Sequence, residues 1–432
     1  MVSLHGKPCL EKGGNKNNRQ GYVLVQLLKT CGKKKDLFKG SRLHVEILRK
    51  GLLEKCPYLA SSLISMYAKC GALTKAKKLL EQFGVRDIVS WNALISGFVK
   101  QRRNSEAIIC FDQMQEEGFS PDMITFTCIL KACSTLRDVD KGKSIHDDII
   151  SRGLFEKDTI LGTSLVDMYA KCGMLRKAQN LFEELHVRNV VSWNVVMEGC
   201  VQHGQFHEVL NYAEQMQNEG LSPDAVTFTC ILKVCGNIRD FNKGKQIHEE
   251  IINRGLLEKD IVLGNALVDM YSKCGMLPNA RKALENLHIR NVVSWNALIG
   301  GYIGQGQGHE ALDCLKQMQA EGTSPDEITF IFILKACGSI GDLEKGKIIH
   351  DEIVNKRLLK KSILLGTTLV DMYAKCGLLG KAKQILEELS DRNVVSWNAL
   401  ITSYVQHGQS HEALRCFEWM QNEGIVADES TF

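Results

Sequence analysis

The chain has 432 residues, of which 44% are hydrophobic and 24% charged, and its formal net charge is only +4. A charge so close to balance argues neither for nor against a nucleic-acid partner. No apolar run approaches the roughly 20 residues that a bilayer-spanning helix needs, so no membrane partner is predicted. The length would suit about three ordinary domains, but internal repetition overrides that expectation.

One interval of 102 residues organises the sequence. It separates the members of three series, which are Trp91, Trp193, Trp295 and Trp397; Cys70, Cys172, Cys274 and Cys376; and His44, His146, His248 and His350. Four copies without an insertion or deletion predict a stacked repeat protein rather than a globular enzyme. The function of such a chain lies in what its extended surface binds.

In chain order, residues 1–20 are predicted to be an N-terminal tail. They lack the apolar run of a secretory signal. A transit peptide is neither identified nor excluded there.

Each 102-residue interval then divides into related repeats of 36, 31 and 35 residues. Twelve repeats are predicted over 21–428, with the boundaries 21–56, 57–87, 88–122, 123–158, 159–189, 190–224, 225–260, 261–291, 292–326, 327–362, 363–393 and 394–428. Residues 429–432 match the start of another 36-residue repeat, so we expect the sequence to stop inside a truncated thirteenth repeat.

Each repeat is predicted to form two amphipathic helices. In 190–224, Gln202-His203-Gly204 separates the two helices, since Gly accepts a positive φ at a helix end. Ser222-Pro223-Asp224 turns the chain into the next repeat, because Pro cannot continue a helix and Asp is a good N-cap. A single hairpin cannot bury both apolar faces, so stacking must supply a continuous core and an all-α fold.

The sixteen cysteines fall mostly at equivalent repeat positions, and no CxxC occurs. This pattern favours buried thiols in a reducing compartment over a zinc site. We therefore predict no metal and no cofactor. The histidines of the KGKxIH series are interpreted as surface or hairpin-packing residues rather than ligands.

Four spaced motifs, VSWNALI, MYAKCG, GHEAL and MQxEGxxPD, recur across the alternating 35-, 36- and 31-residue repeats. In these features the chain closely resembles pentatricopeptide repeat proteins of the PLS subclass from land plants, over residues 21–428. The resemblance implies a right-handed α-solenoid of tandem helical hairpins. It also implies sequence-specific binding of single-stranded RNA, one base per repeat, by a protein of the mitochondrion or chloroplast.

In that family the fifth and last residues of each repeat select the base. Carried over, the pairs in the 35-residue repeats are Asn92 with Asp122, Asn194 with Asp224, Asn296 with Asp326, and Asn398 with Asp428. The pairs in the 31-residue repeats are Ser61 with Asp87, Thr163 with Asn189, Asn265 with Asn291, and Thr367 with Asn393. In the 36-residue repeats Thr127 pairs with Asp158 and Thr229 with Asp260, but the family's code is poorly defined there.

The remaining 36-residue repeats carry Val25 and Ile331 at the fifth position, which cannot hydrogen-bond a base. The resemblance thus implies a 5′-to-3′ target of N-G-U-N-A-U-N-Y-U-N-A-U. It further implies that an aliphatic second residue packs on the base, at Val89, Val191, Val293 and Val395. Phosphate contacts are expected from Lys69, Lys171, Lys273 and Lys375.

Each of these residue types also has a purely structural explanation. N-capping alone would account for the last-position Asp residues, and a helix dipole for the lysines. The second-position valines could equally be core. The four tryptophans could stack on RNA, but we favour inter-hairpin core for them.

The chain is predicted not to be an enzyme. His44-Val45-Glu46 supplies the H-x-E of a cytidine deaminase, but the P-C-x-x-C that the zinc also needs is absent from the sequence. The resemblance therefore suggests C-to-U editing of organelle transcripts as the process, with editing-complex proteins or a deaminase in trans as further partners. The alternative function is a helical-repeat scaffold that binds protein partners.

Overall fold

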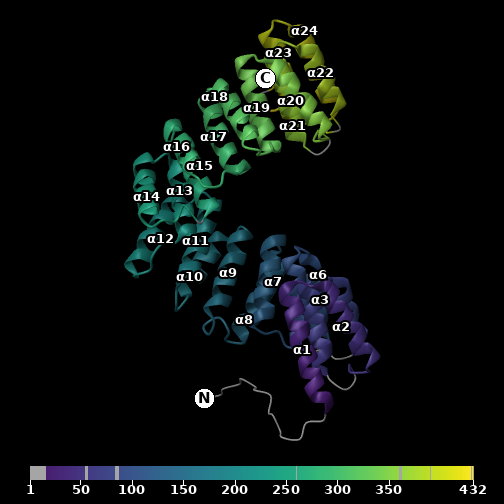
Figure 1. Cartoon of the computed structure of the whole chain (residues 1–432). Helices are drawn as coiled ribbons and strands as arrows, with labels where there is room; N and C mark the ends of the chain where they lie inside the picture. Colours follow the sequence, from purple (N-terminus) through teal and green to yellow (C-terminus); the bar gives the residue numbers. More distant parts are fainter. Residues whose placement is uncertain are drawn as a thin grey trace. The chain divides into compact units, whose positions relative to one another are not determined.

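The computed structural model describes residues 16–53, 57–82, 87–258, 260–359, 362–389, 391–429 and 431. These residues form twenty-four α-helices and no strand, so the predicted all-α fold class is confirmed (Figure 1). The helices fall into an N-terminal half, 1–205, and a C-terminal half, 206–432, and each half is described by itself. Residues 1–15 of the expected tail lie outside the described residues.

The N-terminal half holds eleven helices among its described residues. They are α1 (Lys16–Lys34), α2 (Leu37–Arg49), α3 (Pro57–Lys69), α4 (Leu73–Gln82), α5 (Ile88–Lys100), α6 (Asn104–Glu116), α7 (Met123–Leu136), α8 (Val139–Ser151), α9 (Thr159–Lys171), α10 (Leu175–Glu184) and α11 (Val190–Gln202).

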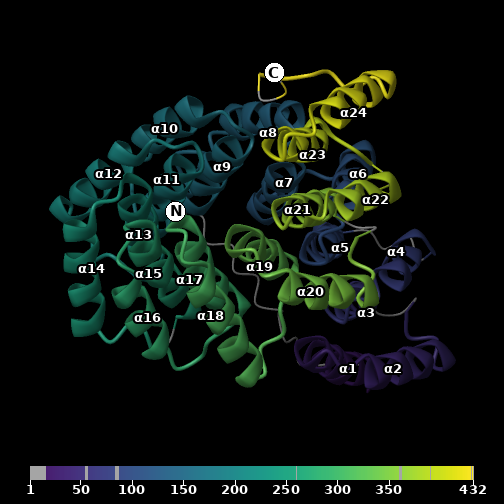
Figure 2. The same cartoon turned by 90° about the horizontal axis from the view of Figure 1, so that it is seen from above.

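The C-terminal half continues with thirteen described helices, and Figure 2 shows their regular side-by-side stacking. They are α12 (Phe206–Asn218), α13 (Ala225–Ile238), α14 (Phe241–Asn253), α15 (Ile261–Lys273), α16 (Leu277–Glu285), α17 (Val292–Gly304), α18 (Gly308–Ala320), α19 (Glu327–Ile340), α20 (Leu343–Asn355), α21 (Ile363–Lys375), α22 (Leu379–Glu388), α23 (Val394–Gln406) and α24 (Ser410–Asn422).

Helix starts follow the repeat pattern of the sequence closely. From residue 57 onward, every predicted repeat begins at the first residue of an odd-numbered helix, whereas α1 begins at Lys16, upstream of Gly21. The capping residues explain the agreement. Asp122, for example, precedes α7, and its side chain accepts a hydrogen bond from the backbone N–H of Thr125 at 2.9 Å, which satisfies an otherwise unpaired donor.

Odd-numbered helices form one continuous layer in each half. Each packs on the next odd-numbered helix, as α3 does on α5 and α15 does on α17, while even-numbered helices pack on odd-numbered ones. The four tryptophans at the 102-residue interval are at most 3% exposed, so they are core residues and the RNA-stacking alternative is wrong. Trp193, for instance, packs edge-on against Phe182 with ring centroids 4.7 Å apart.

The KGKxIH series joins the second helix of each 36-residue repeat to the next repeat. In α8, Gly142 lets the helix approach α9 so closely that an added Cβ would lie 2.5 Å from Sδ of Met168. One turn later, Nδ1 of His146 lies 2.9 Å from the hydroxyl of Tyr169. The same His–Tyr contact recurs at His44, His248 and His350, so each of these histidines packs between one repeat and the next.

Fourteen of the sixteen cysteines lie in the described residues, and each of these is a free thiol. Burial raises the pKa of Cys133, Cys235 and Cys337 to about 12, so these thiols are protonated and inert at neutral pH. Within the described residues no helix combines the length and apolar character needed to cross a bilayer.

Candidate nucleic-acid interface

The fifth and last residues of the 35-residue repeats lie in direct contact. Asn92 sits on the second turn of α5, and its Nδ2 donates to the Asp122 carboxylate at 2.9 Å and 3.0 Å. The same hydrogen bond joins Asn296 to Asp326 at 2.9 Å. It also joins Asn398 to Asp428 at 2.8 Å. Sequence positions 30 residues apart are thus brought together three times.

The fourth pair consists of Asn194 on α11 and Asp224 at the start of α13. Asn194 is buried, like Asn92 and Asn296. Asp224 caps α13 by accepting from the backbone N–H groups of Val226 and Thr227. Asn194 belongs to the N-terminal half of the chain and Asp224 to the C-terminal half.

A threonine completes each described pair. The hydroxyl of Thr125 donates to Oδ1 of Asn92 at 2.6 Å, and Thr329 donates to Asn296 at 2.7 Å. Thr431 repeats the contact with Asn398 at 2.8 Å. These threonines occupy the third position of the following 36-residue repeat and were not predicted as site residues.

The last-position aspartates both cap a helix and hold the asparagine. Burial raises the pKa of the Asp326 carboxyl, but hydrogen bonds from Thr329 and Asn296 outweigh it and keep that pKa below its ordinary value. Asp326 is therefore ionised at neutral pH. The capping and base-selecting explanations of this residue are compatible, because one oxygen serves the helix and the asparagine together.

The pairs of the 31-residue repeats differ from one another. Ser61 donates to Asp87 at 2.7 Å. Thr163 and Thr367 instead donate to carbonyls of their own helices. Their last-position partners Asn189 and Asn393, like Asn291, cap the next helix through Oδ1. In the third repeat of this kind, Oδ1 of Asn265 is buried and has no hydrogen-bond partner.

Within the described residues of the 36-residue repeats, no hydrogen bond joins the fifth side chain to the last. Thr127 and Thr229 donate to carbonyls one turn earlier in their own helices. Asp158 and Asp260 cap α9 and α15. Each of these hydroxyls donates within its own helix, so it does not contact the aspartate at the last position of its repeat.

Second-position side chains form an exposed apolar series. Val89, Val191, Val293 and Val395 are 55–61% exposed, so the alternative that they belong to the core is wrong. The same position is exposed in all twelve repeats, and the other members are Tyr22, Tyr58, Ile124, Ile160, Val226, Val262, Ile328 and Leu364. An apolar or aromatic second residue in every repeat was the signal that could have identified the whole series.

The four lysines are exposed at the ends of their helices. Lys171, Lys273 and Lys375 each form an ion pair with the aspartate four residues earlier, at 2.7–2.8 Å. Exposed pairs of this kind contribute little to stability. Lys69 has Ser65 at the corresponding position, so it lacks this intrahelical partner.

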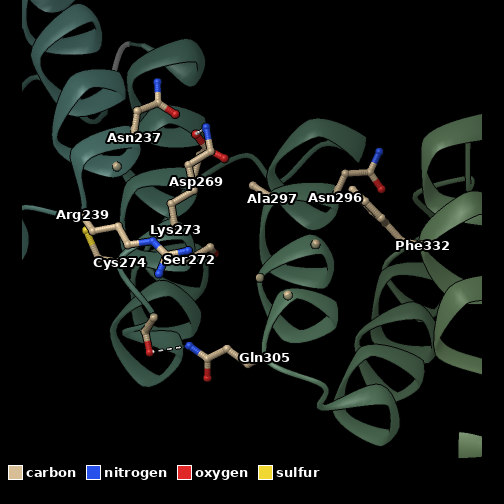
Figure 3. Close-up of a pocket in the computed structure, with 15 residues that line it drawn as sticks. Asn237, Arg239, Asp269, Ser272, Lys273, Cys274, Asn296, Ala297, Gln305 and Phe332 are labelled. Carbon is tan, nitrogen blue, oxygen red and sulfur yellow. Dashed lines mark hydrogen bonds and ion pairs between the residues drawn. The ribbon is translucent and has the colours of Figure 1, made fainter. Parts of the chain in front are cut away.

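One pocket brings a predicted base-selecting residue and a predicted phosphate-contacting residue together. The α15–α17 pocket, of about 570 Å³, is lined by Asn296 and Lys273 and bordered by Phe332 (Figure 3). It opens because α17 carries Gly300 and Gly304 where the other 35-residue repeats have larger residues.

Arg239 also lines this pocket and was missed in the sequence. It ends α13 in a left-handed conformation with φ 58°, which favours glycine. Arg137 adopts the same conformation at the equivalent place, where the last copy has Gly341. The available signal was one Gly, at 341, in a repeat position that is basic in the other three copies, Lys35, Arg137 and Arg239. Its left-handed backbone and its place at the pocket make Arg239 a candidate site residue.

Comparison with known proteins then identifies the family. Residues 86–135, 188–237, 290–339 and 392–432 match the PPR repeat family, and 59–88, 124–154, 163–190, 226–256 and 367–394 match the PPR repeat. The chain belongs to the pentatricopeptide repeat family. It is 32% identical to the mitochondrial pentatricopeptide repeat-containing protein At1g06140 of Arabidopsis thaliana, over 94% of this chain and 73% of that protein.

Other pentatricopeptide relatives are longer. The chloroplastic protein At1g11290 of Arabidopsis thaliana is 34% identical over 95% of this chain but only 50% of its own length. The chain therefore spans about half the length of that relative and 66% of another, the chloroplastic At4g18520, which is 33% identical. In fold, the crystal structure of PPR10 from maize matches 95% of this chain and 60% of its own with a TM-score of 0.70, at 18% identity.

Proposed function

We propose that this pentatricopeptide repeat chain binds single-stranded RNA sequence-specifically, one base per repeat, as the specificity factor of an organelle RNA-processing step such as C-to-U editing. We assign no catalytic step to its residues, so a deaminase would lie outside this chain or in a partner. The chloroplastic and mitochondrial names of the relatives support an organellar location.

The observation that carries the proposal is the pairing of fifth and last residues beside an exposed apolar second residue. Asn296 contacts Asp326, while Val293, three residues before Asn296 on α17, is 55% exposed. An exposed aliphatic face suits the flat surface of any base, whereas an amide with a carboxylate partner can read a base edge. This combination recurs in the other 35-residue repeats with described pairs.

Backbone contacts would come from the cations that flank these readers. Lys273 and Arg239 line the same pocket as Asn296, and Lys69 has no intrahelical carboxylate. Phosphates bound by such side chains would contribute affinity that falls with salt, and they would carry no sequence information.

The alternative function, a protein-binding scaffold, has one observation in its favour. A second exposed apolar series lies on the second helices of the 36-residue repeats, and its members are 48–55% exposed at Leu48, Ile150, Ile252 and Val354. Such residues are typical of protein contacts. The two functions are compatible, since an RNA-bound array can present this series to a protein partner.

A mobility-shift titration tests the proposal. The target N-G-U-N-A-U-N-Y-U-N-A-U is compared with a scrambled oligonucleotide of equal composition at physiological salt. We expect the target to bind at least tenfold more tightly, since several discriminating contacts of about 1–3 kcal/mol are in play. Equal affinity for both oligonucleotides would reject sequence-specific binding. A protein partner that stays bound to the chain after nuclease treatment, together with a failure of the chain to cross-link to RNA, would favour the scaffold function.

A further inference from the structure

We propose that the third residue of the 36-residue repeats is a specificity-positioning residue, which fixes the side-chain amide of the preceding repeat's asparagine in one orientation. The residues are Thr125, Thr329 and Thr431. The inference rests on the proposed function and deepens it, because it explains how an Asn–Asp pair distinguishes uracil from cytosine.

Hydrogen bonds link the asparagine, the aspartate and the threonine of each copy to one another. In the copy around the α15–α17 pocket, Nδ2 of Asn296 donates to Asp326 at 2.9 Å and its Oδ1 accepts from Thr329 at 2.7 Å. The hydroxyl of Thr329 also accepts from the backbone N–H of Asp326 at 3.2 Å. The backbone therefore anchors the threonine oxygen, and the threonine in turn anchors the amide.

This arrangement admits one amide orientation. Rotating the amide of Asn296 by half a turn would place Oδ1 against the carboxylate of Asp326, and two oxygens without a proton between them repel. It would also turn the nearer of the two acceptors that face the fully buried Thr329 hydroxyl, Oδ1 of Asn296 at 2.7 Å, into a donor, and leave only Oδ1 of Asp326 at 2.9 Å as an acceptor. Loss of the shorter hydrogen bond inside this buried network disfavours the flipped amide.

A fixed amide presents its remaining donor and acceptor in a fixed order. Uracil and cytosine differ in the order of groups on their Watson–Crick edge, because O4 and N3–H of uracil are replaced by an amino group and an unprotonated N3. An amide that can rotate is able to satisfy either edge. An amide that threonine and aspartate hold in one orientation matches only one order of donor and acceptor on the base. We call this arrangement the lock, and it converts binding of either pyrimidine into a preference for uracil.

The chain contains its own unlocked counterpart. Asn265 holds the fifth position of repeat 261–291, and its Oδ1 has no hydrogen-bond partner. The third residue of the following repeat, Ser294, donates to the carbonyl of Asn291 at 2.8 Å and not to Asn265. By this argument repeat 261–291 accepts both pyrimidines, as its Asn–Asn pair implies from the family resemblance.

The test measures base preference at single positions of the target RNA. Affinities of the full chain are determined for oligonucleotides carrying U, C, A or G at the ninth base, which repeat 292–326 reads. We expect Thr329→Val to lower the U-over-C affinity ratio about three- to tenfold, since one oriented hydrogen bond is lost. The ratio at the third base should stay unchanged, and Thr329→Ser should restore the ratio at the ninth.

Ser294→Ala is the matched control, because it removes a third-position hydroxyl of the same capping-box kind that touches no fifth residue. Its preference at every base should equal that of the unsubstituted chain. Thr125→Val, read at the third base, repeats the test in a second copy if Thr329→Val fails to fold by circular dichroism.

The outcomes separate this inference from the proposed function. If the unsubstituted chain shows no preference at the ninth base, the residue assignments of the proposed function fail, and the lock fails with them. If the unsubstituted chain prefers U and Thr329→Val weakens U and C equally, the threonine is only structural. That result overturns the inference and leaves the proposed function intact.

Discussion

The side-chain amide of Asn92 donates a hydrogen bond to the carboxylate of Asp122 at 2.9 Å, although 30 residues separate them. Asp122 simultaneously caps α7, which opens the next repeat. The contact that we propose to select a base and the cap of a helix therefore share one carboxylate. Because of this coupling, we expect a substitution at Asp122 to change both RNA preference and stability, and only a substitution that preserves the cap to separate the two.

Exchanging the pair of repeat 88–122 should change the base that it prefers. Asn92→Thr combined with Asp122→Asn installs the pair that repeat 159–189 carries as Thr163 with Asn189. We expect preference at the third base to move from U to A. Asn is as good an N-cap as Asp, so the free energy of unfolding should change by less than about 1 kcal/mol. Competition binding with third-base variants provides the measurement, and an unchanged preference for U would break the residue assignments.

The exposed second-position residues should matter for RNA and not for folding. Val293→Ala leaves the core intact, so the melting temperature should hold, while affinity for every RNA falls about two- to fivefold with the lost apolar contact. Leu298→Ala, in the core of the same helix, is the contrasting variant and should cost about 2–5 kcal/mol of stability. A clear loss of stability in Val293→Ala, with RNA affinity unchanged, would contradict this assignment.

Local chemistry explains why so much of the fold could be predicted from the sequence. Helix starts depend on caps such as Asp122 and on turn residues close by in sequence, so eleven repeat boundaries coincide with helix starts. The burial of Trp193 followed from its size and its apolar neighbours. The two-helix repeat required only periodicity, which one sequence displays.

Properties that depend on contacts between neighbouring repeats could not be predicted from the sequence. Val191 and Val196 both fit an apolar helical pattern, yet Val191 is exposed and Val196 buried, because packing against adjacent helices decides which face is covered. The contact between Thr125 and Asn92 spans 33 residues. Thr125 already had a sufficient local role in the capping box of α7, which concealed its second partner.

Arg239 offers a variant in which stability and binding change in opposite directions. Arg239→Gly relieves a left-handed residue, so the free energy of unfolding should stay level or rise by up to about 1 kcal/mol. If Arg239 contacts a phosphate, the slope of log affinity against log salt should decrease by about 0.7. Titrations at several salt concentrations measure this slope. Lys316→Gln, which removes an exposed cation outside the pocket, is the control and should leave the slope unchanged. If Arg239→Gly has the same slope as Lys316→Gln, Arg239 does not contact the RNA backbone.

The contact between His146 and Tyr169 predicts a pH dependence of stability. Burial lowers the pKa of His146 and Lys177 lowers it further, while Asp147 and Glu184 oppose the shift. A neutral ring that is protonated at Nε2 accepts the Tyr169 proton at Nδ1, whereas a fully protonated ring has no acceptor there. The folded chain therefore resists a proton that the unfolded chain binds near pH 6.5.

The sign of the pH dependence follows from that difference. Above about pH 6.5 His146 is neutral in the folded and the unfolded chain, so it does not make stability depend on pH. Below about pH 6.5 the unfolded chain binds the proton first, so stability is lost as the pH falls toward the lower pKa of the folded chain. His146→Phe keeps an aromatic ring and removes this titration. Its melting temperature should decline less steeply than that of the unsubstituted chain as the pH falls below about 6.5. The exposed His207→Phe serves as the control, and parallel curves for the unsubstituted chain and His146→Phe would show that this buried pair does not set the acid sensitivity of the fold.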